Sequence, residues 1–355
     1  VLLLMLAGGL VCLPLVLFNR IPPNDTAGFY APMMRELGAG NWGVGFYHII
    51  PPMLVLTGAP FAALGAPAFA AAKLASSLYL VLTLLPLWAL CRRFHSRRVA
   101  VTACILLLLC SRLLRYAGDG VLASCKTFYF VLMVYALAAC VQDRRWRHAV
   151  LLGGAGAGLA LARGEGILFV VPALVCLLVS VWWPAGVLVA SGRRARAALQ
   201  AFAAGAVVAV LVSPWVYYEY RVCGWPVTDS KQKALFEMLL QHAGEGDAAA
   251  LPRQTPAPAP VIRAEILQDQ VKSTLEEVGK GLFIPYLIFA LVHVGLSLRR
   301  QTWSRWDSFF LAAIAAHTLF FVAFAKVTGV IEKRYFVAAI PLYLPWAATA
   351  MLGLW

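Results

Sequence analysis

Charged residues are scarce in this chain: Asp, Glu, Lys and Arg make up 13% of its 355 residues, against 62% that are hydrophobic. A soluble globular domain carries about twice that charged fraction. The sequence also lacks an internal repeat and any stretch polar enough to form a separate soluble domain. Because many uninterrupted apolar runs approach about 20 residues, these absences exclude a soluble fold and indicate an all-α, polytopic integral membrane protein.

Cysteine patterns are missing as well. All eight cysteines except Cys223 lie in or beside apolar segments, with no CxxC pair and no clustering with histidine. Neither a disulfide framework nor a zinc finger is indicated, and we expect the cysteines to be small core residues. The formal net charge of +14 would favour a polyanion partner in a soluble protein. Here the basic residues stand between apolar runs, so no nucleic-acid partner is expected.

Four arginine clusters, at 92–98, 143–147, 193–196 and 299–305, separate the apolar runs and should all face the cytoplasm. Because the clusters share one side of the membrane, an even number of spans must separate each cluster from the next, and this rule predicts about ten spans. The first run has neither a basic leader nor a cleavage site, so we expect a retained span, preceded by a few further residues because the sequence starts without Met. The predicted spans are 1–18, 66–90, 99–114, 121–140, 149–162, 167–190, 198–215, 281–298, 308–325 and 335–355.

The whole chain, 1–355, is interpreted as one transmembrane domain with two notable outer loops. The first, 19–65, contains "MLVLTGAPFAALG", which is too short to span and suits a helix lying at the outer interface. The second, 216–280, places two amphipathic stretches on either side of a Pro-Ala linker.

Charged residues within the membrane or at its edge are the best functional candidates, because burying them there is costly unless they line a polar cavity. Four such groups fall at the outer ends of predicted spans: Asp25 with Tyr30, Arg35 and Glu36; Arg115 with Asp119; Arg163 with Glu165; and Lys326 with Glu332, Lys333 and Arg334.

The third group follows a short span, "AVLLGGAGAGLALA", whose roughly 14 residues cover only about 21 Å of a bilayer core about 30 Å thick. Arg163 and Glu165 therefore lie below the outer surface. The glycines at 153, 154, 156 and 158 should let neighbouring helices pack closely and shield these charges. The two side chains form either a mutually neutralising pair or part of an anionic-ligand site.

Each remaining candidate has two interpretations. Asp25 is either the N-cap of the helix that "TAGFYAPMM" begins or a general base at the mouth of an outer cavity. His48 is either a metal or phosphate ligand or an ordinary interfacial histidine. Lys333 and Arg334 either bind phosphate or anchor the last span at the interface.

In order along the chain, these motifs resemble one family. They are an Asp soon after the first span followed by "FYAPMMRELGAGNW", then "YHIIPPMLVLTGAPFAALGAPAFAAAKLASSLYLVLTLLPLWALCRRF", then "GAGLALARGEGILFVVPALV", and finally "EKRYFVAAIPLYLPWAATA". Together they are similar to the GT-C membrane glycosyltransferases of the protein O-mannosyltransferase and aminoarabinose transferase type.

The resemblance implies an enzyme that moves a sugar from a polyprenyl-phosphate carrier to an acceptor on the outer side of the membrane. The arginine-rich inner loops and the compact size fit a bacterial inner membrane, with the outer side facing the periplasm. The resemblance also implies that Asp25 is catalytic and that Arg334 and Lys333 contact the lipid phosphate. Arg163, Glu165 and Tyr30 would line the substrate site. The acceptor, whether protein, lipid or glycan, and the sugar stay open.

The chain departs from the family pattern at three places. Thr26 stands where many relatives have a second acid, His48 is shifted from the position directly before "PP", and Asp119 is the nearest match to an acid of the second outer loop. Because metal use varies across the superfamily, a divalent metal is neither assigned nor excluded. Two rival functions remain: a transporter or lipid-linked-sugar flippase, which would need polar sites on both faces, and an inactive scaffold relative.

Overall fold

The structure, a computed structural model, describes residues 1–43, 50–180, 191–223, 276–328 and 333–353. These residues form helices and contain no strand, which confirms the predicted all-α class. Five of the described helices are long and apolar enough to cross a membrane: α4, α7, Ala195–Arg221 within α10, Arg305–Phe324 within α14, and Lys333–Gly353. The total of about ten spans stays a prediction.

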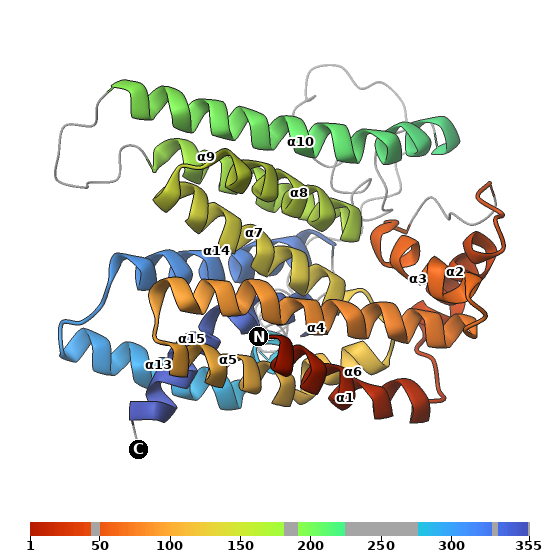
Figure 1. Ribbon diagram of the computed structural model, residues 1–355, viewed down its shortest axis with the longest axis horizontal. Coiled ribbons are helices and arrows are strands. Elements are labelled where there is room, and N and C mark those ends of the chain that lie inside the picture. Colours follow the sequence, from red (N-terminus) through yellow and green to blue (C-terminus); the bar gives the residue numbers. More distant parts are fainter. Residues whose placement is uncertain (44–49, 181–190, 224–275, 329–332, 354–355) are drawn as a thin grey trace, which may run out of the picture.

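The helices run side by side along the long axis of the molecule (Figure 1). The first half of the chain contains α1 (Leu2–Phe18), the π-helical turn η1 (Thr26–Tyr30), α2 (Ala31–Gly38), α3 (Met53–Ala63), α4 (Ala68–Phe94), α5 (Arg97–Leu109), α6 (Ser111–Gly118) and α7 (Ala123–Asp143). The second half contains α8 (Trp146–Ala162), η2 (Gly164–Gly166), α9 (Ile167–Val179), α10 (Ser191–Cys223), α13 (Ile284–Arg299), α14 (Arg305–Thr328), η3 (Lys333–Tyr335), η4 (Val337–Ala339) and α15 (Ile340–Gly353).

Packing follows a simple order across the bundle. Helix α10 lies on α8 and α9, α8 packs on α7, α7 on α4, and α4 on α1, α5 and α6. Helix α15 is sandwiched by α13 and α5, and almost all of its side chains are buried. The short helices α2 and α3 pack together at one end of the bundle, at the right of Figure 1. The ends of α1 and α6 and the starts of α4 and α7 meet at this same end.

Within the described residues each predicted span contains a helix, and the helix expected at "MLVLTGAPFAALG" is α3. Residues 181–190, the end of the sixth predicted span, lie outside the described residues. The third predicted span is not straight: α5 and α6 meet at Cys110 with a bend of 53°. Helix α10 continues to Cys223, so the first residues of the predicted outer loop 216–280 are helical. Most of that loop lies outside the described residues.

Glycines in α8 allow the close packing that the sequence predicts. A side chain at Gly158 would collide with the Tyr129 ring, and one at Gly153 would collide with the backbone of α10 at Ala204. Gly154, by contrast, faces open space, so that part of the prediction is wrong. The cysteine prediction is confirmed for the described residues: those cysteines are unpaired thiols in buried or half-buried positions.

The basic clusters lie at the opposite end of the bundle from α2 and α3. Arg93, in the last turn of α4, forms an ion pair with Asp143 at the end of α7 and donates a hydrogen bond to Gln142. Since α4 is 27 residues long, about 40 Å separate its two ends. This polarity agrees with the predicted arrangement of arginines on one side and isolated acids on the other.

Candidate active site

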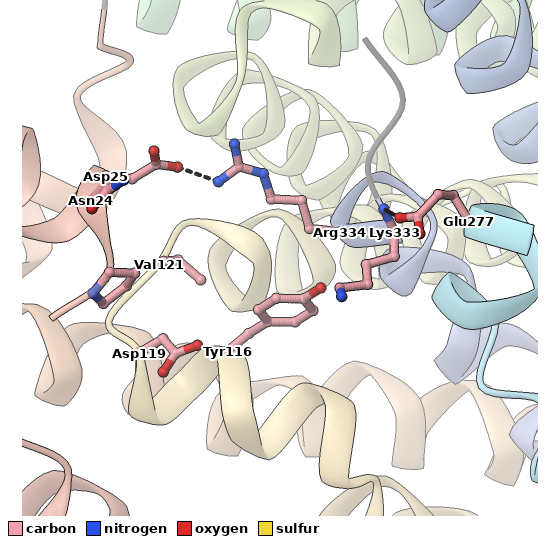
Figure 2. Close-up of a pocket in the computed structure, with 9 residues that line it drawn as sticks. Asn24, Asp25, Tyr116, Asp119, Val121, Glu277, Lys333 and Arg334 are labelled. Carbon is pink, nitrogen blue, oxygen red and sulfur yellow. Dashed lines mark hydrogen bonds and ion pairs between the residues drawn. The ribbon is translucent and has the colours of Figure 1, made fainter. Parts of the chain in front are cut away.

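Asp25 and Arg334 form an ion pair at the end of the bundle where α2 and α3 lie. The Arg334 Nη1 group donates to Asp25 Oδ2, and the two side chains are 30% and 37% exposed, respectively (Figure 2). Asp25 immediately precedes η1, and Arg334 lies in the turn η3, so the contact joins residues 309 positions apart. The Asp25 carboxylate makes no capping hydrogen bond. The capping interpretation is therefore wrong, because the carboxylate binds the guanidinium of Arg334 and not the N–H groups of the local backbone.

This ion pair borders a cavity of about 300 Å³. Its walls come from the segment before η1, the α6–α7 turn, the residues that precede α13, and η3. The lining residues are Pro23, Asn24, Asp25, Tyr116, Asp119, Val121, Glu277, Lys333 and Arg334. The cavity thus brings together Asp25, Asp119, Lys333 and Arg334, four residues that the sequence nominates.

Hydrogen bonds lock the first two outer loops together beneath the cavity. Asn19 Nδ2 donates to the Gly118 carbonyl at 2.9 Å and to Asp119 Oδ1 at 3.2 Å. The Thr26 hydroxyl, fully buried, donates to the Asp119 carbonyl at 2.8 Å. The residue that replaces a second acid of the family is therefore a structural link and not a cavity group. Asp119 Oδ2 also forms an ion pair of 3.7 Å with Nε of the exposed Arg115 side chain.

Arg163 and Glu165 form the ion pair that the sequence allows. Two hydrogen bonds of 3.1 and 2.8 Å join them in a bidentate geometry, and Glu165 is only 2% exposed. Arg163 also lies 4.6 Å from the centroid of the Tyr335 ring. The pair therefore supports η3 from below and is not among the residues that line the cavity.

Two further side chains hold η3. Lys126, in the first turn of α7 and 2% exposed, donates to the Tyr335 carbonyl at 2.8 Å and lies 3.8 Å from the Phe321 ring centroid. Glu277 Oε2 accepts the backbone N–H of Lys333 at 3.0 Å. With Arg163 on the Tyr335 ring, these contacts fix both ends of the three-residue turn that carries Lys333 and Arg334.

The remaining nominated residues lie elsewhere. Tyr30 is 6% exposed and belongs to a small core formed with α2, α3 and α4. Burial, together with the nearby negative charge of Asp25, raises the pKa of Tyr30 to about 12, so its phenol is neutral at physiological pH. His48 lies outside the described residues, and its role stays a prediction.

Metal binding finds no support in the residues that the structure describes, since no three His, Cys, Asp or Glu side chains among them are arranged to hold an ion. Two carboxylates that line the cavity have partners within the protein: Asp25 binds Arg334, and Glu277 binds the Lys333 backbone.

Three contributors to the site were not identified from the sequence: Tyr116, Lys126 and Glu277. Lys126 carried a usable signal, because it falls inside the predicted span 121–140, where a charge is costly. Tyr116 and Glu277 carried none, since a tyrosine near a span end and a glutamate in "LEEV" are both ordinary.

Known proteins share this architecture. Residues 50–218 match the model of the dolichyl-phosphate-mannose-protein mannosyltransferase family, whereas a comparison with curated protein sequences gives no match. ArnT from Cupriavidus metallidurans bound to undecaprenyl phosphate aligns with a TM-score of 0.64 and 18% identity over 99% of this chain and 59% of that one. The Archaeoglobus fulgidus oligosaccharyltransferase in complex with Zn and sulfate aligns with a TM-score of 0.60 and 17% identity over 98% and 49%.

The chain thus spans less than two thirds of the length of either structure. At these identities the likeness establishes the fold, and the matching family model covers the segment from the residues before α3 into α10. The resemblance indicated by the sequence motifs is therefore confirmed at the level of the fold: the chain has the GT-C architecture of membrane glycosyltransferases, and residues 50–218 carry the sequence pattern of the mannosyltransferase family.

Proposed function

We propose that this protein is a glycosyltransferase that moves a sugar from a polyprenyl-phosphate carrier to an acceptor at the outer face of a bacterial inner membrane. The observation that carries the proposal is the Asp25–Arg334 ion pair at the edge of a cavity that also contains Lys333. A carboxylate beside two cations supplies what the reaction requires, namely a proton acceptor and a binding site for a phosphate leaving group.

The reaction needs little more than these groups. The acceptor oxygen or nitrogen attacks the anomeric carbon, the bond from that carbon to the phosphate oxygen breaks, and polyprenyl phosphate leaves with the bonding electrons. The acceptor proton passes to the Asp25 carboxylate. Arg334 and Lys333 stabilise the negative charge that builds on the departing phosphate, Arg334 through the bidentate geometry that suits its guanidinium.

The ion pair itself has a function in this scheme. While Arg334 binds Asp25, the carboxylate oxygen Oδ2 is occupied by the guanidinium. The donor phosphodiester carries one negative charge, as the carboxylate does, and its two free oxygens compete for the same guanidinium. Binding of the donor would thus free Asp25 at the moment when a base is required, which couples activation of the base to occupancy of the phosphate site.

Sidedness is supported by the distribution of charge along the bundle. The cavity lies at the end of the bundle away from Arg93, and the predicted cytoplasmic clusters at 92–98, 143–147 and 299–305 begin at the opposite ends of α4, α7 and α13. By the excess of Lys and Arg in cytoplasmic loops, the cavity would face the periplasm. Similarity to a structure bound to undecaprenyl phosphate supports a lipid-linked donor.

A transporter or flippase for lipid-linked sugars is the alternative. The transferase is favoured because Asp25, the proposed proton acceptor, and Arg334, a proposed phosphate ligand, lie together at one end of the bundle. A reconstituted assay separates the two functions. The purified full chain in proteoliposomes is supplied with undecaprenyl-phosphate-linked mannose, glucose or aminoarabinose and an envelope extract that contains protein, lipid and glycan acceptors.

A transferase converts the sugar-linked lipid to undecaprenyl phosphate and labels an acceptor, and a flippase moves the intact lipid between leaflets without consuming it. Chromatography of the lipids measures the first outcome, and accessibility of the headgroup to a membrane-impermeant reagent measures the second. Movement of intact lipid with no product in any combination of sugar and acceptor would contradict the proposal.

A further inference from the structure

A second cavity, of about 440 Å³, lies far from Asp25 and Arg334. It is at the end of the bundle away from α2 and α3, the left in Figure 1, where α4 and α7 end and α14 begins. Its walls include Gln142, Thr302 and Ser304, whose side chains are exposed, so the cavity opens to the outside. Its lining residues have no part in the proposed sugar transfer.

The walls of this cavity carry hydrogen-bond donors that the protein leaves open. The Trp306 indole N–H makes no hydrogen bond to the described residues, yet it retains surface that a ligand can touch. The nearby Trp303 indole, by contrast, donates to the Ser308 hydroxyl at 2.8 Å. His293 makes one hydrogen bond among the described residues, between Nε2 and the Ser297 hydroxyl at 3.2 Å. When that hydroxyl is the donor, Nδ1 carries the ring proton and can donate to a ligand.

The strongest acceptors in the same walls already have partners. Asp307, the acid that lines the cavity, is 7% exposed. Its carboxylate accepts from the Ser304 hydroxyl and backbone N–H at 2.6 and 2.9 Å, and from Trp346 Nε1 at 2.8 Å. The Gln142 side-chain oxygen accepts from Arg93 Nη1 at 3.1 Å, which leaves the amide N–H groups as donors. The cavity therefore favours an anionic oxygen acceptor such as a phosphate.

Positive charge surrounds this cavity. The segments 92–98 and 299–305, which contribute to its walls, contain seven arginines and no acid. Six of the seven are exposed and form no ion pair with the described residues: Arg92, Arg97, Arg98, Arg299, Arg300 and Arg305. Membrane topology alone accounts for arginines on this side, but it does not require a cavity with open donors between them.

The remaining lining is aromatic, which distinguishes a lipid from a free phosphate ion. The Phe94 ring centroid lies 4.5 Å from that of Trp306 and 5.4 Å from that of Phe310. Beside the cavity, Leu298 at the end of α13 and Leu311 in α14 are 58% and 46% exposed, as residues in contact with acyl chains would be. A phosphate ion would leave these apolar surfaces unused, whereas a phospholipid matches both the donors and the rings. Basic pockets between helices on the cytoplasmic side are suited to anionic lipid headgroups.

We propose that this cavity binds the phosphate headgroup of an anionic phospholipid of the inner leaflet, with Trp306, His293 and Gln142 as donors to the phosphate. The exposed arginines attract the headgroup, and the aromatic rings contact the glycerol and the first acyl carbons. One lipid in this position bridges α4, α7, α13 and α14, so its binding should raise the melting temperature of the chain. The site lies outside the catalytic cavity and is independent of the proposed function.

The substitution Trp306→Phe tests the central donor, because it removes the open N–H and keeps an aromatic ring against Phe94. Trp303→Phe is the matched control, since the N–H that it removes already has a partner in Ser308. Neither variant changes the net charge, so the general attraction of this arginine-rich face to anionic lipid is equal in both. Thr302→Phe provides a second test. It places a bulky ring at an exposed position of the wall, where the Thr302 hydroxyl makes only a 3.5 Å contact with the Ser297 carbonyl.

Binding is measured on the purified full chain in neutral detergent by native mass spectrometry, with phosphatidylglycerol, phosphatidylcholine and inorganic phosphate as separate probes. Wild type and Trp303→Phe should bind one phosphatidylglycerol in preference to phosphatidylcholine, and the bound lipid should raise the melting temperature. We expect Trp306→Phe to weaken phosphatidylglycerol binding about 10- to 100-fold, the range for a hydrogen bond to a charged group. Thr302→Phe should abolish the preference by filling the cavity.

Three results overturn the proposal. Equal binding of phosphatidylglycerol and phosphatidylcholine to the wild type, or equal affinity of Trp306→Phe and Trp303→Phe for phosphatidylglycerol, would show that the arginines serve topology alone. Competition by inorganic phosphate as strong as that by phosphatidylglycerol would assign the cavity to a free anion. Sugar transfer is not a readout here, so a chain that binds the lipid but transfers no sugar retains this site and refutes only the transferase.

Discussion

Lys126 Nζ donates a hydrogen bond of 2.8 Å to the backbone carbonyl of Tyr335, 209 residues farther along the chain. The contact joins the first turn of α7 to the turn that carries Lys333 and Arg334. A lysine with 2% exposure is costly in a membrane bundle, and here the carbonyl and the face of Phe321 compensate it. The two proposed phosphate ligands are thus positioned by a buried lysine that does not line the cavity.

The substitution Lys126→Met tests this positioning. It removes the ammonium group and leaves the Tyr335 carbonyl without its donor, so the free energy of unfolding should fall by about 1–3 kcal/mol. Undecaprenyl phosphate binding should weaken as well, because Lys333 and Arg334 lose a fixed backbone. Thermal unfolding and binding to the chain in nanodiscs measure the two effects.

A control at the far end of the bundle separates positioning from loss of stability. Arg93→Met breaks the ion pair with Asp143, and it should lower the melting temperature without affecting undecaprenyl phosphate binding. If Lys126→Met binds the lipid as tightly as the wild type at a temperature where both are folded, Lys126 has only a structural role.

Thr26 provides a second test, at the position where many relatives have an acid. Thr26→Val removes the hydroxyl that donates to the Asp119 carbonyl at 2.8 Å and should destabilise the fold by about 1 kcal/mol. Thr26→Glu should destabilise it more, because it buries a charge at a fully enclosed position. Thermal unfolding ranks the variants, with Thr26→Ser as the control that retains the donor. A glutamate that is tolerated as well as serine would mean that this position opens to the cavity.

The sequence was sufficient for the described helices because their signal is local. Apolar runs fix the helices, and arginine parity fixes which ends share a side, so Asp25 and Arg334 could be expected at one end of the bundle. The contact between them could not, since it depends on how α1 and η3 approach each other in three dimensions. The same limit explains the error in the capping prediction. The local sequence pattern favoured Asp25 as a helix cap, but its carboxylate binds Arg334, which lies 309 residues away.

Backbone partners were the other part that the sequence could not reveal. Lys126 was visible as a charge within a predicted span, but its acceptor is the Tyr335 carbonyl, which no side-chain pattern encodes. Glu277 likewise binds a backbone N–H, that of Lys333. The bend at Cys110 followed from neither proline nor glycine, because the residues around it, "LLCSR", contain neither.

Tyr30 predicts a pH dependence of stability. Its pKa in the folded chain is raised to about 12, first by burial and then by Asp25, whereas an unfolded tyrosine titrates near pH 10. The raised pKa contributes stability that is fully present below about pH 10 and is lost as the pH rises toward 12, because the unfolded phenol ionises first. Thermal unfolding between pH 9 and 12 should show a smaller decline in Tyr30→Phe than in the wild type. Parallel declines would show that the phenol is not buried.

Arg163 and Glu165 allow their two interpretations to be separated. Either single substitution, Arg163→Met or Glu165→Met, leaves one buried charge uncompensated and should cost about 3–5 kcal/mol of stability. The double variant should recover most of that loss. If the pair only supports η3, the double variant binds undecaprenyl phosphate nearly as well as the wild type. A stable double variant that no longer binds the lipid would instead assign Arg163 to the ligand.

Asp25→Asn is the most direct test of the proposed chemistry, because it has opposite effects on catalysis and binding. Loss of the proton acceptor should lower the transfer rate about 10²- to 10⁴-fold. At the same time Arg334 no longer binds a carboxylate, so the affinity for undecaprenyl phosphate should increase. Misfolding cannot produce this combination, since it weakens both. Glu36→Gln, which removes an acid paired with Arg35 outside the cavity, should change neither. Full transfer by Asp25→Asn would exclude Asp25 as the base, and weaker lipid binding would show that Arg334 and Asp25 do not exchange partners.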